Sequence, residues 1–298
     1  MIKMFIGITI DFLITFLVCL IIYLCTKKHN RPNKKTILKV LGLGVLSIVL
    51  ALVLGNMFSF FYTFMKTLLN LLVTPTGFIS FIDKIINNVL AFVILEELAK
   101  YFLFNRLWNN GVLEQKSPLQ TALIFIIVGS TFSFIEDTMY ILKGVNPIVR
   151  IITIVSGHLT YALIYSLYFS KEVIRSKCLY KMDEYLETLK RNPRFYNIYH
   201  AKEKFLLKGF FISSGFHFLH NILSILGGIG IILLFIEIVA LTVFFIVKIV
   251  KLAKKDVSYD TLAKYRISCD FPGIEKELVT TMKQNYEKEI ENKKNGCI

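Results

Sequence analysis

The chain has 298 residues, of which 55% are hydrophobic, and its mean hydropathy is +0.60. A soluble domain of this length cannot bury so much apolar surface, so the composition excludes an ordinary soluble protein. The net charge of +14 does not indicate a nucleic acid partner, because Lys and Arg gather in the cytoplasmic segments of membrane proteins. We therefore predict an all-α, polytopic helical membrane protein whose surroundings are the lipid bilayer.

Seven apolar segments are long enough to cross a membrane, since a spanning helix takes about 20 residues. In chain order they are Ile2–Cys25, Thr36–Thr63, Lys84–Trp108, Pro118–Lys143, Pro147–Ser170, Phe205–Leu226 and Gly228–Val250. The first segment has no small-x-small cleavage site, so we expect a retained helix and not a removed signal peptide.

Residues 64–83, between the second and third segments, are apolar but are interrupted by Thr-Pro-Thr-Gly at 74–77. Each side of this turn is too short to span the membrane. The stretch is therefore either an interfacial or re-entrant hairpin, or an apolar loop packed on the helices.

Basic residues are concentrated in every second loop between the predicted spans. The loop 26–35 contains five Lys or Arg and no acid, and the loop 171–204 and the segment after residue 250 are also basic. The loops 64–83 and 144–146 carry almost no basic residues. The positive-inside rule then places the N-terminus outside and the C-terminus in the cytoplasm. Within 171–204 we expect one short amphipathic cytoplasmic helix.

Ionisable residues recur inside the predicted spans. They are Asp11, Glu96, Glu97, Lys100, Glu136, Asp137, His158, His217, His220 and Glu237. An acid or a lysine that faces lipid costs about 2.5–3.5 kcal/mol on insertion scales, so such residues indicate functional sites. Taken singly, Asp11, His220 and Glu237 are better explained as structural groups.

Four of these residues lie on four different predicted spans at a similar depth. They are Glu96, Glu136, His158 and His217. Counted from the outer end of each span, all four lie roughly 10–18 Å below the outer surface. Glu96 and Lys100 are four residues apart and share a helix face, and His217 and Asn221 do the same. We expect these side chains to meet in one polar site.

Four motifs on these spans resemble those of the PrsW family of intramembrane proteases. They are "EELAK" at 96–100, "GSTFSFIED" at 129–137, "SGHLTYA" at 156–162 and "HFLHN" at 217–221. Their order matches a Glu-Glu-x-x-Lys helix, a Phe-x-x-x-Glu helix, a single His and a His-x-x-x-Asn helix. The family is similar to the CAAX-processing and Abi endopeptidases. Asp137 departs from the pattern, since the family more often has Asn after the Glu.

The resemblance implies a multi-pass protease of a bacterial plasma membrane. Its partner would be a single-span membrane protein, cut near the extracytoplasmic face as in the first cleavage of an anti-sigma factor. The chain then divides into two N-terminal spans with the interfacial segment (1–83), a catalytic transmembrane core with its cytoplasmic loop (84–250), and a cytoplasmic charged tail (251–298).

Amide hydrolysis needs an activated water, a stabiliser for the oxyanion and an acid for the leaving amine. We predict Glu96 or Glu97 as the base, with Lys100 neutralising one carboxylate. The other predicted site residues are Glu136, His158, His217 and Asn221, of which the last two polarise the carbonyl or hold the oxyanion.

A metal ion is an open alternative. Two histidines and a glutamate match a catalytic zinc site that keeps a fourth position for water. His158 and His217 can supply the imidazoles, and either Glu136 or Glu96 the carboxylate. The His-Glu-x-x-His signature is absent from the sequence, so a zinc-dependent and a glutamate-dependent mechanism both stay open.

Two other classes of protein account for part of the same pattern. Acids and histidines at mid-depth also build proton- or ion-coupled transporters, which predicts inverted repeats and Gly- or Pro-broken helices. The sequence shows neither feature, because Pro118 and Pro147 stand at the starts of spans. A membrane sensor or scaffold would explain the charged tail but not the clustered acids and histidines.

Overall fold

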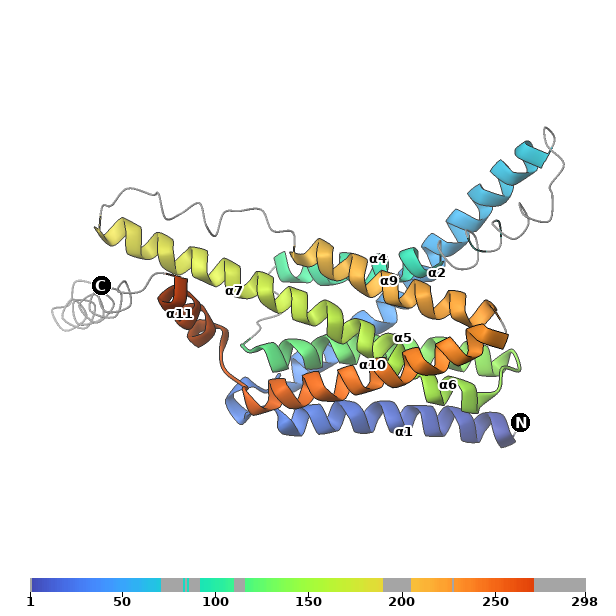
Figure 1. The fold of residues 1–298 in the computed structure, drawn as a ribbon, viewed down its shortest axis with the longest axis horizontal. Helices are drawn as coiled ribbons and strands as arrows, with labels where there is room; N and C mark the ends of the chain where they lie inside the picture. Colours follow the sequence, from blue (N-terminus) through green and yellow to red (C-terminus); the bar gives the residue numbers. More distant parts are fainter. Residues whose placement is uncertain are drawn as a thin grey trace. The chain divides into compact units, whose positions relative to one another are not determined.

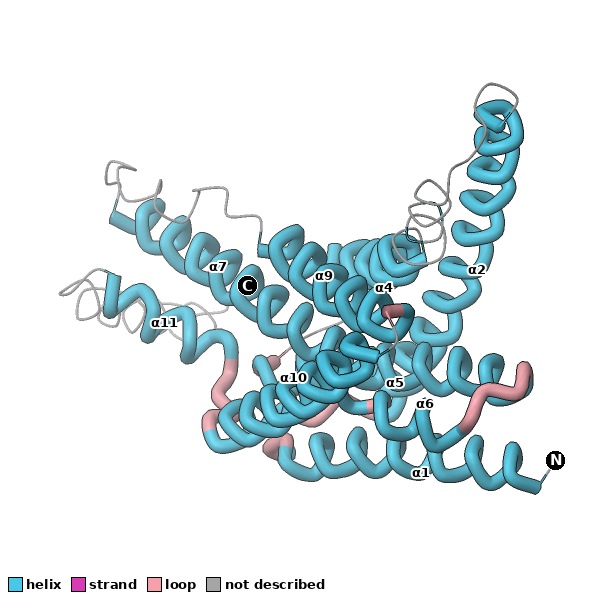
Figure 2. The backbone as a smooth tube through the Cα atoms, turned by 45° about the vertical axis from the view of Figure 1, so that its right-hand side comes forward, coloured by secondary structure: helices cyan, strands magenta, loops and turns pink. Residues whose placement is uncertain are grey.

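The computed structural model describes residues 2–70, 83, 85, 92–109, 116–189, 205–226 and 228–270. Throughout these residues the regular structure is helical, which confirms the predicted all-α class (Figure 1). The helices are α1 (Ile2–Cys25), η1 (Lys28–Asn30), α2 (Lys34–Asn70), α4 (Phe92–Asn109), α5 (Pro118–Leu142), α6 (Pro147–Thr153), the π-helical segment η3 (Val155–Leu159), α7 (Thr160–Leu189), α9 (Phe205–Ile225), α10 (Gly228–Lys254) and α11 (Tyr259–Asp270). Short loops join several of them directly (Figure 2).

Five helical stretches among the described residues are long and apolar enough to cross a membrane. They are Met4–Cys25, Lys34–Thr67, Pro118–Leu142, Pro147–Lys181 and Gly228–Lys254. A multi-pass membrane protein follows from these five. The two other predicted spans overlap α4 and α9, so the count of seven and the orientation stay predictions.

Two boundaries differ from the predicted ones. Helix α2 runs on to Asn70, because no helix-breaking residue follows its apolar part before Pro75. Helix α7 likewise continues to Leu189, since neither Gly nor Pro occurs between Gly157 and Pro193. Most of the predicted interfacial segment, the start of the third span and the end of the tail lie outside the described residues.

The chain divides into two compact units. One comprises Met1–Tyr168 with Leu206–Asp256, and the other Phe169–Phe205 with Val257–Ile298. In the second unit, α11 packs against the later turns of α7: Cys178, Ala263 and Ile267 form a buried cluster, and the Tyr259 hydroxyl donates to Ser170 Oγ at 2.8 Å. Parts of the predicted cytoplasmic loop and tail thus share one core.

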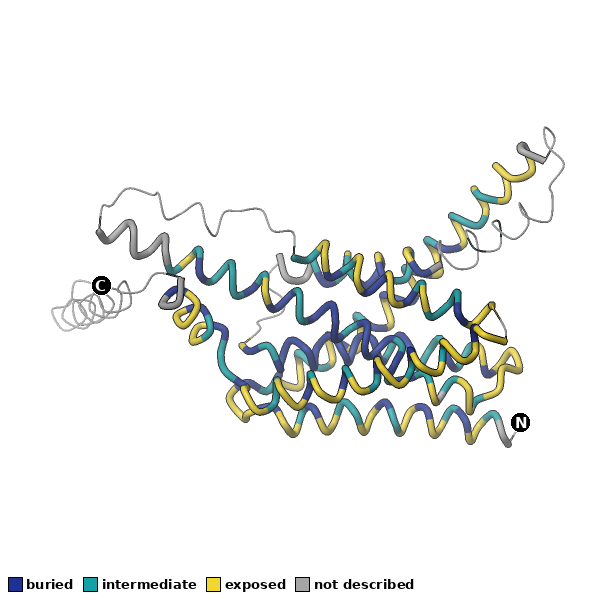
Figure 3. Tube along the Cα trace, viewed as in Figure 1, coloured by how far each residue is buried: buried dark blue, intermediate teal, exposed yellow. Residues whose placement is uncertain are grey.

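Helix α5 is the centre of the first unit. In the apolar 18-residue stretch of α5, 78% of the residues are buried. In the corresponding stretches of α1 and α10 only 22% are buried, and the outer faces of these two helices are exposed (Figure 3). Phe5 and Phe235 are examples of exposed apolar side chains on these outer helices. Such faces suit contact with lipid, while α5 is enclosed by protein.

Glycines and a helix cap place α5 against its neighbours. Ser117 caps the helix by accepting a hydrogen bond from the Gln120 N–H at 3.2 Å, and Pro118 follows at the first helical position. A Cβ at Gly44 of α2 would lie 2.4 Å from Thr131 Cβ, and one at Gly129 would lie 2.8 Å from the His158 carbonyl oxygen. Only glycine permits these two close approaches, and the second brings η3 onto α5.

Candidate active site

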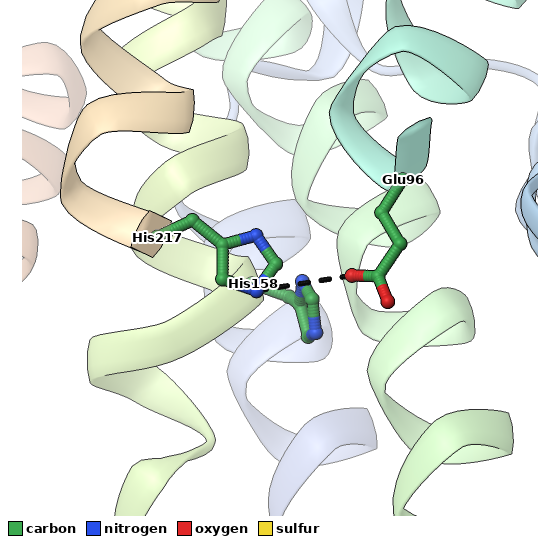
Figure 4. A group of neighbouring side chains, drawn as sticks. All are labelled: Glu96, His158 and His217. Carbon is green, nitrogen blue, oxygen red and sulfur yellow. Dashed lines mark ion pairs between the residues drawn. The ribbon is translucent and has the colours of Figure 1, made fainter. Parts of the chain in front are cut away.

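Three elements bring Glu96, His158 and His217 together (Figure 4). Glu96 comes from α4, His158 from η3 and His217 from α9, and one ligand atom of each lies within 4.8 Å of the others. The His217 Nε2 atom is 3.8 Å from Glu96 Oε2. The predicted convergence of polar groups from separate helices is therefore present in the fold.

The backbone of η3 is broken where it carries His158. Gly157 has non-helical torsion angles of φ −86° and ψ −126°, and the segment forms a π-helical turn between α6 and α7. Single π-helical turns inside α-helices are frequent at functional sites. The break separates the predicted fifth span into α6 and α7 and leaves His158 buried beside α5.

His158 bridges an acid and a base. Its Nε2 lies 2.7 Å from Glu136 Oε2, and its Nδ1 lies 3.1 Å from Lys100 Nζ. An ammonium group can only donate, so we assign Nδ1 as the acceptor and the ring proton to Nε2, which donates to Glu136. Lys100 also lies over the Phe132 ring, 4.2 Å from its centroid.

Glu97 is fully engaged in hydrogen bonds. Lys100 Nζ donates to its Oε1 at 2.7 Å, His217 Nδ1 lies 3.1 Å from the same oxygen, and Ser213 Oγ donates to Oε2 at 3.1 Å. The sequence pattern paired Lys100 with Glu96, but Lys100 instead bonds the carboxylate three residues away. Both spacings put two side chains on one helix face, and His158 draws the ammonium toward Glu97.

Glu96 is the unbonded carboxylate of the group. Among the described residues its side chain makes no hydrogen bond, and it lines a cavity of about 210 Å³ together with Glu136. Ile48, Ala51 and Leu52 of α2 form the opposite wall. A larger apolar cavity of about 460 Å³ lies between α1, α2 and α5, but no acid or histidine lines it. We therefore place the site at the smaller cavity.

The comparison with known families identifies the family of the chain. The model of the family described as "PrsW family intramembrane metalloprotease" matches residues 32–250. The chain belongs to the PrsW family. The match extends on both sides of the four motifs and includes every residue of the polar cluster, which confirms the resemblance seen in the sequence. No curated protein and no solved structure matches the chain.

The donor atoms of this PrsW family site fit a divalent metal ion. Metal-binding histidines commonly donate their other ring nitrogen to a carboxylate, and His217 does so through Nδ1 to Glu97 while Nε2 faces Glu96. In a tetrahedral zinc site with bonds of about 2.0–2.2 Å, ligand atoms are about 3.3–3.6 Å apart. Here His217 Nε2 and Glu96 Oε2 are 3.8 Å apart and all three ligand atoms lie within 4.8 Å of one another, so a bound ion would draw them closer together.

The charges agree with that fit. When the histidines are neutral, the four carboxylates of the site outnumber its three cations, and this excess of negative charge favours a bound cation. The carboxylates are Glu96, Glu97, Glu136 and Asp137, and the cations are Lys100, Arg150 and Lys143. Of the two predicted alternatives for the third ligand, Glu96 lies in the three-residue group, while Glu136 is bonded to His158 Nε2.

Arg150, Ser213 and Tyr161 also contact the polar cluster, and they were not singled out from the sequence. Arg150 Nε binds the Asp137 carboxylate, Ser213 bonds Glu97, and the Tyr161 ring stacks on His217 with centroids 5.0 Å apart. A signal existed for Arg150, since an arginine within the apolar run from Pro147 is as costly as the acids that we did single out.

The remaining polar residues lie elsewhere. Asn221 makes no side-chain hydrogen bond to the cluster within the described part of the chain; its carbonyl accepts from Ser224. His220 Nδ1 lies 2.9 Å from Glu237 Oε2 and links α9 to α10. The Asp11 carboxylate is buried on α1 and finds no hydrogen-bond partner among the described residues.

Proposed function

We propose that this chain hydrolyses a peptide bond of a single-span membrane protein near the extracytoplasmic face of a bacterial plasma membrane. The first cleavage of an anti-sigma factor is the reaction that we expect. The observation that most supports hydrolysis is the meeting of Glu96, His158 and His217 beside a cavity that Glu136 also lines.

In this proposal Glu96, His158 and His217 would hold a divalent metal such as zinc, which would supply a Lewis acid for the peptide carbonyl and the attacking water. To bind it, one ring nitrogen of His158 must exchange its present partner, Lys100 or Glu136, for the metal. Glu136 accepts a proton from the water as it adds to the carbonyl carbon. When the C–N bond breaks, Glu136 returns that proton to the amine nitrogen. Glu97 does not act as a base, because both of its oxygens already accept hydrogen bonds from Lys100, His217 and Ser213. In Glu136 only Oε2 is engaged, by His158 and Arg150, and Oε1 makes no hydrogen bond among the described residues.

We expect the substrate segment to be unwound where it is cut. Inside an α-helix each carbonyl accepts a hydrogen bond from the N–H four residues later, which blocks the approach of a catalytic group to that peptide bond. In an extended segment the carbonyl is open to such a group. We expect cleavage where a substrate helix ends or is broken by Gly or Pro.

The test uses the full chain, co-expressed with a panel of tagged single-span anti-sigma factors, and follows the appearance of a cut fragment. We expect Glu136→Gln to lower kcat by about 10²–10⁴-fold, the range for general acid–base groups, without loss of zinc from the purified protein. Glu96→Gln is expected to lower both zinc content and cleavage, and a chelator is expected to stop the wild-type reaction.

The matched control is Glu237→Gln, which removes another buried carboxylate that pairs with a histidine outside the site. Cleavage that survives chelation would reject the metal, and cleavage that survives in both Glu96→Gln and Glu136→Gln would reject the site. Absence of any cut with every substrate of the panel would favour a transporter.

A further inference from the structure

Arg150 reaches two adjacent acids of α5 from α6. Its Nε binds Asp137 Oδ1, and its Nη2 lies 3.4 Å from Glu136 Oε2. The planar guanidinium fork spans both carboxylates, which a lysine ammonium cannot do with the same geometry. The guanidinium also lies over the Tyr140 ring, 4.4 Å from its centroid.

The oxygen that Arg150 approaches is the one that serves the site. Glu136 Oε2 lies 2.7 Å from His158 Nε2 and 3.4 Å from Arg150 Nη2. Arg150 and His158 stand on either side of the backbone break at Gly157. A single carboxylate oxygen therefore joins the two halves of the broken helix.

Asp137 keeps Arg150 in that place. Its Oδ1 accepts from Arg150, and its Oδ2 accepts from Ser133 Oγ at 3.1 Å, so both oxygens are used. The charge of Asp137 balances that of Arg150 and leaves Glu136 available to His158.

We propose that Arg150 is a positioning residue which, anchored on Asp137, holds the Glu136 carboxylate beside His158. This inference rests on the proposed function, in which Glu136 carries the proton. Without Arg150, Glu136 loses its cation and repels the neighbouring Glu96. Without the Asp137 carboxylate, Arg150 pairs with Glu136 alone and competes with His158 for the Glu136 Oε2 atom.

The experiment compares Arg150→Ala, Arg150→Lys, Asp137→Asn and the double variant Arg150→Ala/Asp137→Asn. We expect Arg150→Ala to lower kcat by about 10–100-fold, as loss of a residue that orients a catalytic group does, with KM changed less than about threefold. Asp137→Asn is expected to lower kcat less. The double variant restores the wild-type balance of charge, so its loss should be smaller than the product of the two single losses. Arg150→Lys should recover part of the activity.

Two further measurements separate positioning from a general structural role. Titration of the metal-free protein with Co²⁺ alone should show that Arg150→Ala lowers cobalt affinity by a smaller factor than it lowers kcat. The ¹⁵N resonance of His158 Nε2 in the metal-free protein should shift or split in Arg150→Ala. The control is Arg175→Ala, which removes an equally exposed arginine from its ion pair with Glu172, each guanidinium side chain being 24% exposed.

An unchanged kcat and an unchanged His158 resonance in Arg150→Ala would overturn the inference, as would strictly multiplicative losses in the double variant. Parallel losses of kcat, cobalt affinity and thermal stability would also overturn it, since they indicate a structural residue. If the wild type cuts no substrate, the proposed function fails, and the His158 resonance alone then decides whether Arg150 positions Glu136.

Discussion

Glu97→Gln tests whether this carboxylate orients the metal-binding histidine. The substitution keeps the shape of the side chain but removes the charge that faces Lys100 and one of the two acceptor oxygens, of which Oε1 serves Lys100 and His217 and Oε2 serves Ser213. Loss of an outer partner of a ligating histidine typically lowers metal affinity about 10–100-fold, or about 1.4–2.7 kcal/mol. The free energy of unfolding should fall by about 3–5 kcal/mol, because Lys100 is left as a buried charge without its partner.

The assay is competition for zinc between the purified protein in detergent and a chromophoric chelator, with thermal unfolding measured in parallel. Glu237→Gln serves as the matched control, since the Glu237 side chain is 8% exposed and that of Glu97 is 7% exposed. We expect the control to change zinc affinity less than about twofold. Equal zinc affinities for wild type, Glu97→Gln and Glu237→Gln would refute the orienting role.

Three further substitutions probe the surroundings of the site. Ala51→Trp should fill the cavity and lower cleavage at least about tenfold, with zinc affinity unchanged. Leu46→Trp, on the exposed side of α2, should leave cleavage unchanged. Equal cleavage by the two variants would show that the substrate binds elsewhere. Gly129→Ala should lower the free energy of unfolding by about 1–3 kcal/mol, because the new methyl group overpacks against the His158 carbonyl. Gly42→Ala, which has open space around it, should leave the free energy of unfolding unchanged. Thermal unfolding of both variants measures the difference. Ser213→Ala removes one of three donors to Glu97 and should lower zinc affinity less than tenfold; a loss as large as that of Glu97→Gln would contradict the shared network.

The helical class and the identity of the clustered residues were within reach of the sequence. Apolar runs of about 20 residues predict membrane helices because the lipid core leaves backbone groups no other partner. Charged residues inside such runs are costly, so Glu96, Glu136, His158 and His217 stood out before any coordinates were considered. Their meeting could be predicted from similar depth alone.

The pairing within the cluster was not predictable in the same way. Spacing along a helix shows which residues share a face, but not how that face is turned toward its neighbours. Lys100 can reach an acid three or four residues earlier with equal ease. Its choice of Glu97 depends on His158, which a different element brings to 3.1 Å. The choice between Glu96 and Glu136 as metal ligand depends on the same packing.

The break at Gly157 also depends on tertiary contacts. Glycine within a helix permits a distortion without requiring one. Here the π-helical turn lies where Gly129 lets the His158 carbonyl approach α5 closely. The two glycines are 28 positions apart in the sequence, so no local pattern connects them. The continuation of α7 to Leu189, by contrast, was readable from the absence of Gly and Pro.

A transporter would make different demands on the same polar groups. A carboxylate that carries protons or ions must exchange them with both sides of the membrane, so its partners must release it in every cycle. In this site Glu97 is tied to Lys100 and His217, and one oxygen of Glu136, Oε2, is tied to His158 and Arg150, which leaves its Oε1 for the proton of the reaction. These pairings surround one unbonded carboxylate, Glu96, with groups that are already fixed. Preorganised polar groups around a reacting centre are what hydrolysis requires, because they stabilise developing charge without rearrangement. The pattern of fixed partners therefore favours hydrolysis over transport.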